Sequence, residues 1–165
     1  MNADALLALV ARLNKFPYPV YLVGGAVRDR FLGREPHDLD FTAQGNIRPL
    51  ASAVADDLRA GFYPLDEDRG TYRVVMDGGR TAIDFASLRG LDLYADLNGR
   101  DFTLNAMALD IARPDELIDP LGGLVDLRER RLRACSPTSL SDDPARALRA
   151  VRLSVGMNLD IDLQT

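Results

Sequence analysis

The sequence predicts a mixed fold of the α/β or α+β class, in which helices flank a mixed sheet. Helical and strand-like segments alternate in the first part of the chain, and several strands follow. The tetrapeptide at residues 77–80, Asp-Gly-Gly-Arg, separates two strand-like runs and is typical of a hairpin. The chain has 165 residues, 47% of them hydrophobic, enough for one domain with a core, or for one domain and a small part of another.

The first helix is expected over residues 4–13, where leucine and valine recur at helical spacing. Asn2 or Asp4 can cap it, and Pro17 and Pro19 end it. This helix is expected to serve packing only.

An apolar strand over residues 20–23 leads into Gly24 and Gly25, and a short helix follows over residues 26–32. A glycine turn at the start of a helix exposes backbone N–H groups, and such groups bind phosphate well. The sequence therefore predicts a phosphate site at this turn.

The next strand is expected over residues 38–43 and carries Asp38 and Asp40. Residues i and i+2 of a strand point to the same face. Two carboxylates on one face repel each other unless a cation lies between them, and Mg2+ prefers such oxygen ligands. A phosphate site followed by this pair indicates nucleotidyl or phosphoryl transfer.

Helices and strands are expected to alternate through the middle of the chain. The expected elements are a helix over 47–58, strands over 62–65, 72–76 and 81–86, a connector over 91–99, a strand over 107–111, and a loop leading into a short helix over 117–127. Asp101 can cap a short helix after the connector. The arginines of residues 128–133 form either a solvated face or a local phosphate patch.

Asp84 lies among apolar residues of an expected strand. A buried aspartate needs a partner. It is therefore either a paired structural carboxylate or a third metal ligand from a strand next to Asp38 and Asp40. The presence of that pair favours the second interpretation.

The last clear helix is expected to start at a cap formed by Ser141 or Asp142 and to run through Pro144 to about residue 155. Its packing face is expected to consist of Leu148, Val151 and Val155. Arg146, Arg149 and Arg152 recur every third residue and form a row, with Asp143 one turn before the first of them. This row is either an exposed face with local salt bridges or a charged strip that faces a nucleotide. The residues after Gly156 are expected to have little to pack against, as in the front part of a larger architecture.

Composition narrows the function classes. No apolar run approaches the roughly 20 residues of a membrane span, and a signal peptide is not expected at the N-terminus. Cys135 and His37 are the only residues of their types, which excludes an internal disulfide and histidine-rich or cysteine-rich metal sites. A reducing cytoplasm is the simplest location. The net charge of −5 makes nonspecific nucleic-acid binding poor, so RNA would require a local patch or parts outside this sequence.

Six motifs occur in a fixed order: LVGGAVRD with LG, DLDF, IDF, RDFTLNAMA, DPLGGLVDL and DDPARALRAVRL. In this set, from Tyr21 to Gly156, the chain resembles the class II tRNA nucleotidyltransferases and bacterial poly(A) polymerases of the polymerase-β-like superfamily. The resemblance implies an α+β nucleotidyltransferase head over residues 1–136. It also implies the start of an α-helical neck over residues 137–165, with the later tRNA-gripping domains absent.

The resemblance also implies roles for individual residues. Asp38, Asp40 and Asp84 would be catalytic and hold Mg2+. The implied nucleotide-binding residues are Gly24, Gly25, Arg28, Arg100, Asp101, Asn105, Asp143, Arg146, Arg149 and Arg152. Among these, the helix from Asp143 to Arg152 would recognise the base of CTP or ATP, and the glycine turn with Arg28 would bind the triphosphate.

Three departures from the family pattern bear on the activity. Gly99 stands where the family usually has a first arginine before DFT, and Asp142 stands where it usually has glutamate. The segment from Asp84 to Arg100 is short, as in members that add only CC. The implied function is CMP addition, as CC or as part of CCA, to the 3′ end of tRNA. The alternatives are poly(A) tailing of general RNAs and a catalytically weak nucleotide-binding module.

Overall fold

The computed structural model describes residues 2–15 and 18–165. The chain divides into two compact units. Met1–Leu88 and Ala108–Leu117 form one of them, here called the sheet unit, and Arg89–Met107 and Ile118–Thr165 form the second unit. Within the described ranges, no helix is both long and apolar enough to span a bilayer.

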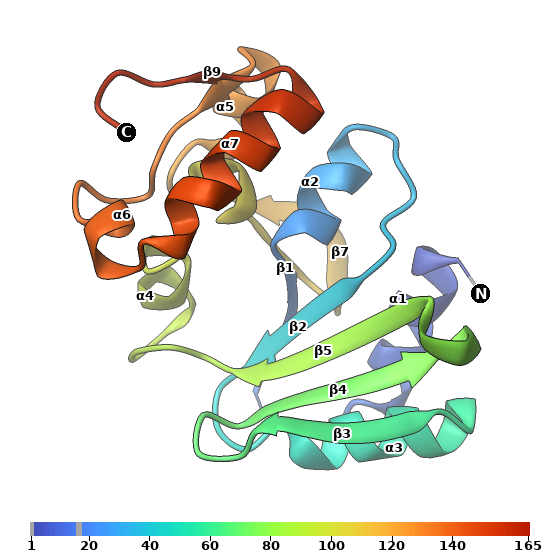
Figure 1. Cartoon of the computed structure of the whole chain (residues 1–165). Coiled ribbons are helices and arrows are strands. Elements are labelled where there is room, and N and C mark those ends of the chain that lie inside the picture. Colours follow the sequence, from blue (N-terminus) through green and yellow to red (C-terminus); the bar gives the residue numbers. More distant parts are fainter. Residues whose placement is uncertain (1, 16–17) are drawn as a thin grey trace. The chain divides into compact units, whose positions relative to one another are not determined.

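The sheet unit contains a mixed seven-stranded sheet in the order β3-β4-β5-β2-β1-β6-β7 (Figure 1). β2 and β5 are parallel, whereas β1–β2, β1–β6, β3–β4 and β4–β5 are antiparallel. The strands are β1 (Val20–Val23), β2 (Leu39–Ala43), β3 (Gly61–Asp66), β4 (Thr71–Met76), β5 (Thr81–Ser87), β6 (Ala108–Asp110) and β7 (Arg113–Ile118). The mixed sheet and the β4–β5 hairpin predicted from the sequence are confirmed, while β7 was missed.

Three helices belong to this unit: α1 (Ala3–Leu13), α2 (Gly25–Phe31) and α3 (Arg48–Leu58). Asn2 caps α1 by accepting the Ala5 N–H at 2.9 Å. The expected role of Pro17 in ending this helix lies outside the described residues.

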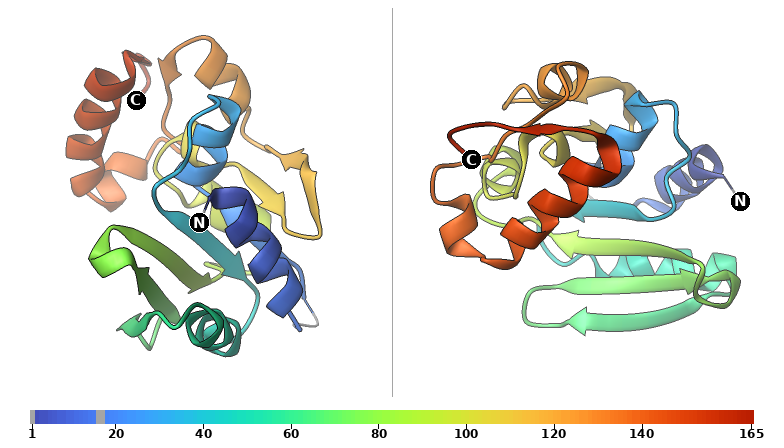
Figure 2. Two further views of the ribbon diagram at one scale, coloured as in Figure 1. Left: turned by 90° about the vertical axis from the view of Figure 1, so that its right-hand side faces the viewer. Right: turned by 45° about the horizontal axis from the view of Figure 1, so that its top comes forward.

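The two faces of the sheet differ in chemistry. α1 and α3 lie against one face (Figures 1 and 2), and the buried rings of Phe41 and Phe85 stack with centroids 5.4 Å apart. Because side chains alternate along a strand, the neighbouring residues Asp40 and Asp84 point to the opposite face. The apolar core therefore fixes which face carries the carboxylates.

The second unit consists of short elements around a small core. Phe102, Leu104, Leu132, Ala150 and Leu159 form its buried cluster. The elements are α4 (Leu93–Asn98), a 3-10 turn (Thr103–Asn105), α5 (Gly123–Arg128), β8 (Arg131–Leu132), α6 (Ser139–Asp142), α7 (Ala145–Met157) and β9 (Asp160–Ile161). The short helix after residue 117 is confirmed as α5, whereas α4 replaces the connector expected over 91–99.

The C-terminal segment corrects two expectations about packing. Leu159 is 6% exposed, and β9 pairs in parallel with β8, so the residues after Gly156 do have packing partners. Leu148, Val151 and Val155, the expected packing face of α7, are 77%, 57% and 79% exposed. The buried side of α7 instead consists of Ala150 with the partly buried Leu153 and Met157. A stripe of apolar residues at helical spacing identifies one face of a helix. It does not show whether other elements of the fold cover that face.

The predicted cap of α7 is also wrong. Ser141 and Asp142 belong to a helix of their own, α6, and Asp143 ends it with an extended backbone. The Asp143 side chain then accepts the Ala145 N–H at 3.0 Å, just before α7 begins. The break arises because the residue before a proline is disfavoured in the helical region.

Candidate active site

The Gly24–Gly25 turn lies between β1 and α2. Gly24 has φ 76 and ψ −142, a conformation that side chains strongly disfavour. A Cβ at Gly25 would lie 3.3 Å from the Arg28 guanidinium, so the Arg28 side chain folds back over the turn. Asp29 holds this guanidinium at 2.8 Å. The structure thus brings together the glycine turn and Arg28, two predicted phosphate-binding features.

The three predicted catalytic carboxylates come from two adjacent strands. Asp40 on β2 is the direct register partner of Asp84 on the parallel strand β5. Asp38 precedes the first residue of β2, is exposed, and accepts the Ala82 N–H at 3.3 Å. The expected strand therefore starts one residue later than predicted, but it still brings the carboxylates to one region of one sheet face.

Arg73 lies beside the predicted carboxylates and was not among the residues expected from the sequence. It is the register partner of Asp84 in the β4–β5 hairpin. Its Nε and one terminal nitrogen donate to the two Asp84 oxygens at 2.7 Å each. The hydrogen bond to Asp84 raises the pKa of Arg73, and the charges of Asp38 and Asp40 add to that effect against the opposing effect of burial. The signal was available, because a turn over residues 77–80 places residue 73 opposite residue 84.

The donor chemistry of the three carboxylates fits a hard divalent cation, which prefers oxygen ligands. No group of three or more His, Cys, Asp or Glu residues is arranged for metal binding within residues 2–15 and 18–165. Both oxygens of Asp84 bond Arg73 instead. Metal binding by Asp84 would therefore require this ion pair to open or to share the carboxylate.

In the second unit, Asp101 is the centre of the predicted nucleotide-binding motif. It is 6% exposed, and one of its oxygens accepts the Phe102 N–H at 2.7 Å and the Asn105 amide at 3.2 Å. Its other oxygen accepts Arg149 at 2.8 Å. Asp101 therefore orders the turn before the 3-10 helix rather than capping it, and it joins two motifs that are far apart in sequence.

Arg100 and Arg146 are also held within this unit. Arg100 donates to Asp96 at 3.0 Å. Arg146 donates to the carbonyls of Gly99 at 2.9 Å and Arg100 at 3.2 Å. Its Nε is 3.8 Å from Asp143. The three arginines of the row on α7 therefore differ in their surroundings. Arg146 and Arg149 bond within the second unit, whereas Arg152 is exposed.

Two of the four arginines in the basic run at 128–133 bond inside the second unit, whereas Arg128 and Arg130 are exposed. Arg131 and Arg133 each bond Asp126, whose side chain is fully buried. Asp126 also accepts the Thr103 hydroxyl at 2.6 Å. Burial alone would raise the pKa of Asp126, but the hydrogen bonds from Thr103, Arg133 and Arg131 lower it overall. The sequence left open whether these arginines form a solvated face or a phosphate patch. Arg131 and Arg133 do neither in the main, because their principal partner is Asp126.

A glycine turn that leads into a helix, followed by carboxylates on two adjacent strands of a mixed sheet, defines a nucleotidyltransferase head. The family model for the poly A polymerase head domain matches residues 20–133. The chain belongs to this family.

Similar proteins agree with this assignment. A CC-adding tRNA nucleotidyltransferase of Geobacter sulfurreducens is 42% identical over 161 residues, covering 98% of this chain and 37% of that protein. An A-adding tRNA nucleotidyltransferase of Deinococcus radiodurans is 42% identical over 153 residues, covering 93% of this chain and 34% of that protein. A CCA-adding enzyme of Streptococcus pyogenes is 31% identical over 180 aligned positions, covering 96% of this chain and 42% of that protein.

Solved structures give the same result for the fold. The apo form of a tRNA-processing enzyme matches with a TM-score of 0.85 and 35% identity, over 98% of this chain and 44% of that one. A tRNA-processing enzyme with CTP matches with a TM-score of 0.81 and 34% identity, over 97% of this chain and 43% of that one. The predicted α+β, polymerase-β-like fold is confirmed. The chain spans well under half the length of each of these proteins.

Proposed function

We propose that the chain is the catalytic part of an RNA 3′-end nucleotidyltransferase that adds CMP from CTP to tRNA. The observation that supports this most directly is the set of Asp38, Asp40 and Asp84 on one sheet face. In this reaction the 3′ hydroxyl of the RNA attacks the α-phosphate of the nucleotide, and pyrophosphate leaves.

Each unit has its own part in this proposal. Asp38, Asp40 and Asp84 would hold Mg2+, which when bound would stabilise the charge that develops on the attacking and leaving oxygens. The backbone of Gly24 and Gly25 and the guanidinium of Arg28 would bind the β- and γ-phosphates. These residues supply N–H donors where negative charge accumulates.

The second unit would select the nucleotide. Asp143 offers an acceptor. Arg146 would offer a fork of donors on leaving the Gly99 and Arg100 carbonyls that it bonds in this structure, and the two together can match a base edge. Arg100, Asp101 and Asn105 would bind the ribose end, with Arg149 holding Asp101 and Arg152 adding positive charge. We also propose the division into a head over residues 1–136 and the start of a helical neck over residues 137–165.

The choice of CC addition rests on the short segment between Asp84 and Arg100, and the alignment lengths agree with it. The alignment with the CCA-adding enzyme runs over 180 positions, more than the 165 residues of this chain, so that enzyme has positions without a counterpart here. The CC-adding relative aligns over 161 residues and 98% of the chain. This agrees with the short segment between Asp84 and Arg100. The alignment with the A-adding relative, over 153 residues, also lacks extra positions. Alignment length therefore does not separate CC addition from A addition, and a direct assay is needed.

The test is to incubate the full chain with Mg2+, with each labelled nucleotide, and with tRNA that ends before CCA. We expect transfer of CMP in preference to AMP. Transfer of AMP to general RNAs would instead support poly(A) tailing, and binding of nucleotide without transfer would support a nucleotide-binding module. A cytoplasmic location remains a prediction based on the single cysteine.

Substitution of the carboxylates tests the site itself. Asp38→Ala and Asp40→Ala should each abolish transfer, while nucleotide binding without metal survives. Asp115→Ala is the control, because Asp115 is an exposed carboxylate on β7 of the same sheet. Transfer that persists in either active-site variant would contradict the metal assignment.

A further inference from the structure

A row of four side chains crosses the sheet at the level of the carboxylates. The register pairs Tyr63 of β3 with Arg73 of β4, Arg73 with Asp84 of β5, and Asp84 with Asp40 of β2. Direct register partners on adjacent strands point to the same face. Tyr63 and Arg73 therefore lie on the same face as the carboxylates, and the proposed chemistry leaves Tyr63 without a role.

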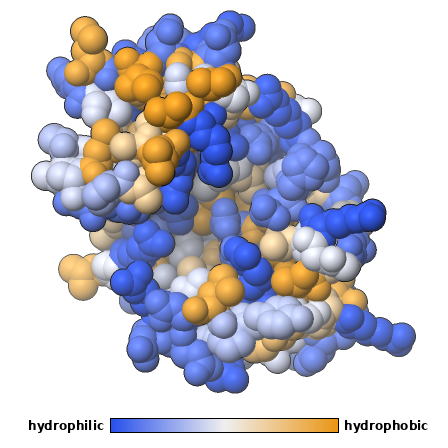
Figure 3. Space-filling view, in the orientation of Figure 1, coloured by the Kyte–Doolittle hydropathy of each residue, from blue (hydrophilic) through white to orange (hydrophobic). Residues whose placement is uncertain are grey.

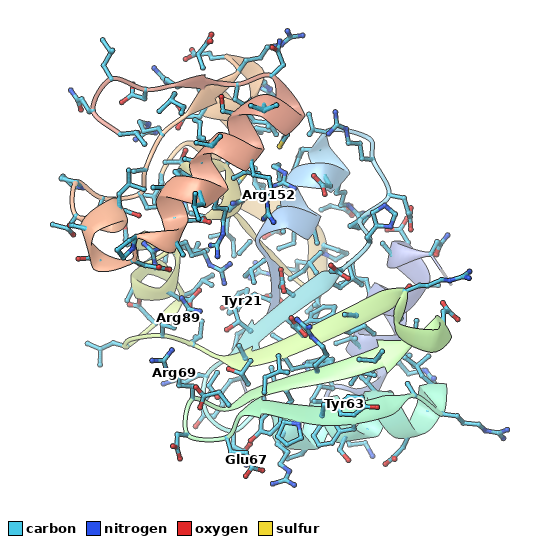
Figure 4. The ribbon with its side chains drawn as sticks, in the orientation of Figure 1. Tyr21, Tyr63, Glu67, Arg69, Arg89 and Arg152 are labelled. Carbon is cyan, nitrogen blue, oxygen red and sulfur yellow. The ribbon has the colours of Figure 1, made fainter. Side chains whose placement is uncertain are left out.

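The Tyr63 ring lies flat and open to solvent. The residue is 54% exposed, and Figure 4 shows its ring lying along β3 at the edge of the sheet. A Cβ at Gly61 would come within 2.8 Å of this ring, so the glycine leaves the space that the ring occupies. The surrounding surface over β3 to β5 mixes hydrophilic and hydrophobic groups (Figure 3). An exposed ring in a mixed surface is suited to a ligand that is itself both flat and polar.

Arg73 is the neighbour that joins this ring to the carboxylates. Its guanidinium is fixed by two bonds of 2.7 Å to Asp84, yet its side chain is 42% exposed. It supplies a planar positive group in a chain whose net charge is −5. A negatively charged strand that approaches Asp38, Asp40 and Asp84 is favoured by such a cation, which adds to the positive charge of the Mg2+ that the carboxylates would hold.

The order of the strands separates this row from the triphosphate site. In the sequence β3-β4-β5-β2-β1, Asp40 lies on β2, the glycine turn follows β1 on one side, and Tyr63 and Arg73 lie on the other side. Strands are about 4.8 Å apart, so Tyr63, two strands away, lies roughly 10 Å from Asp84. The two substrates of a transfer reaction would thus approach the carboxylates from opposite sides.

We propose that Tyr63 and Arg73 form a stacking platform for the 3′-terminal nucleotide of the RNA acceptor. Proteins bind single-stranded RNA ends by stacking bases on aromatic rings and guanidinium planes. Tyr63 receives the terminal base, and Arg73 lies between that base and Asp84. The platform gives the acceptor end a place on the sheet unit itself. This assignment rests on the proposed function.

The experiment uses the full chain and a tRNA that ends before CCA, with 4-thiouridine at its 3′ terminus. Irradiation should crosslink this nucleotide to the peptide that contains Tyr63. Tyr63→Ala should reduce the crosslink and raise the KM for RNA roughly five- to tenfold, because stacking on an aromatic ring is lost. The KM for CTP should not change. Tyr63→Phe keeps the ring and should behave as the unsubstituted chain does.

Tyr18→Ala is the matched control, because Tyr18 is another exposed tyrosine of the sheet unit, at 49%. An unchanged crosslink and unchanged KM for RNA in Tyr63→Ala would overturn the platform. A rise in the KM for CTP alone would also overturn it. The chain could instead self-associate through Tyr63 on the edge strand. Sedimentation would then show a dimer that Tyr63→Ala dissociates, and this result would overturn the platform in favour of a protein interface.

The two proposals fail in different ways. If the unsubstituted chain transfers no nucleotide to any RNA, the proposed function fails, while the crosslink still reports where the RNA end lies. If transfer occurs and Tyr63→Ala is indistinguishable from the unsubstituted chain, only the platform fails.

Discussion

Gly99 shows how a single departure from the family pattern can be examined in the structure. Its backbone is in the right-handed helical region, with φ −79 and ψ −4, and a Cβ there would meet its nearest neighbour, the Ala95 carbonyl, at 3.4 Å. The Gly99 carbonyl accepts Arg146, a contact that any residue could supply. The glycine is therefore not required by the backbone at this position.

Cys135 is a partly buried thiol that we expect to be slow to react. Burial, followed by the nearby charge of Asp101, raises its pKa to about 12. At pH 8, on the order of one thiol in ten thousand would then be ionised, and the thiolate is the reactive form. We expect Cys135 to react with a disulfide reagent roughly a thousandfold more slowly in the folded chain than in urea. Equal rates in both conditions would show that the folded protein does not shield the thiol.

At the scale of elements, the packing of α5 explains Gly123 of the DPLGGLVDL motif. Asp119 accepts the N–H groups of Gly123 and Leu124 at 2.7 and 2.9 Å and so holds the first turn of α5. A Cβ at Gly123 would overlap the Thr103 carbonyl oxygen. Only glycine allows α5 to approach this backbone so closely, and Thr103 belongs to the RDFTLN motif. The DPLGGLVDL motif thus positions the RDFTLN motif.

Two glycine substitutions test this packing. Gly123→Ala should lower the free energy of unfolding by roughly 1–3 kcal/mol or more, because the added methyl group overlaps fixed backbone. Gly156→Ala is the matched control, since Gly156 lies in α7 and a Cβ there would have no atom of the described residues within 4 Å beyond its own helix backbone and chain neighbours. It should raise the free energy of unfolding by about 0.5–1 kcal/mol, because alanine favours the helix. Urea titration followed by circular dichroism measures both, and equal effects would contradict the close approach.

At the scale of the whole molecule, each unit has its own charged centre. In the sheet unit, Arg73 offsets part of the negative charge of the three carboxylates. In the second unit, Asp126 joins α5, β8 and the RDFTLN motif through Arg131, Arg133 and Thr103. Removing one partner of such a buried cluster leaves an uncompensated charge and is strongly destabilising.

The lowered pKa of Asp126 predicts acid sensitivity. Its ordinary value is 3.8, and the folded value is lower, so folding is stabilised by the ionised form. This contribution is fully present above the ordinary value and is lost as the pH falls through the lower, folded-state value. Asp126→Asn should therefore be less stable at neutral pH and should lose less stability on acidification. Asp115→Asn serves as the exposed control, and identical pH profiles for Asp126→Asn and the unsubstituted chain would contradict this role.

The sequence by itself determined the local parts of this protein. The glycine turn, the spacing of Asp38 and Asp40, and the hairpin at residues 77–80 follow from backbone preferences and side-chain alternation within a few residues. The ordered motifs also indicated the family.

Only the tertiary structure decided how distant segments meet. It joined Arg149 to Asp101, buried Leu159, and left Leu148 exposed. These outcomes depend on which apolar surfaces cover one another across the fold. A periodic pattern in one segment carries no information about its partner, so such contacts could not be predicted from the residues alone.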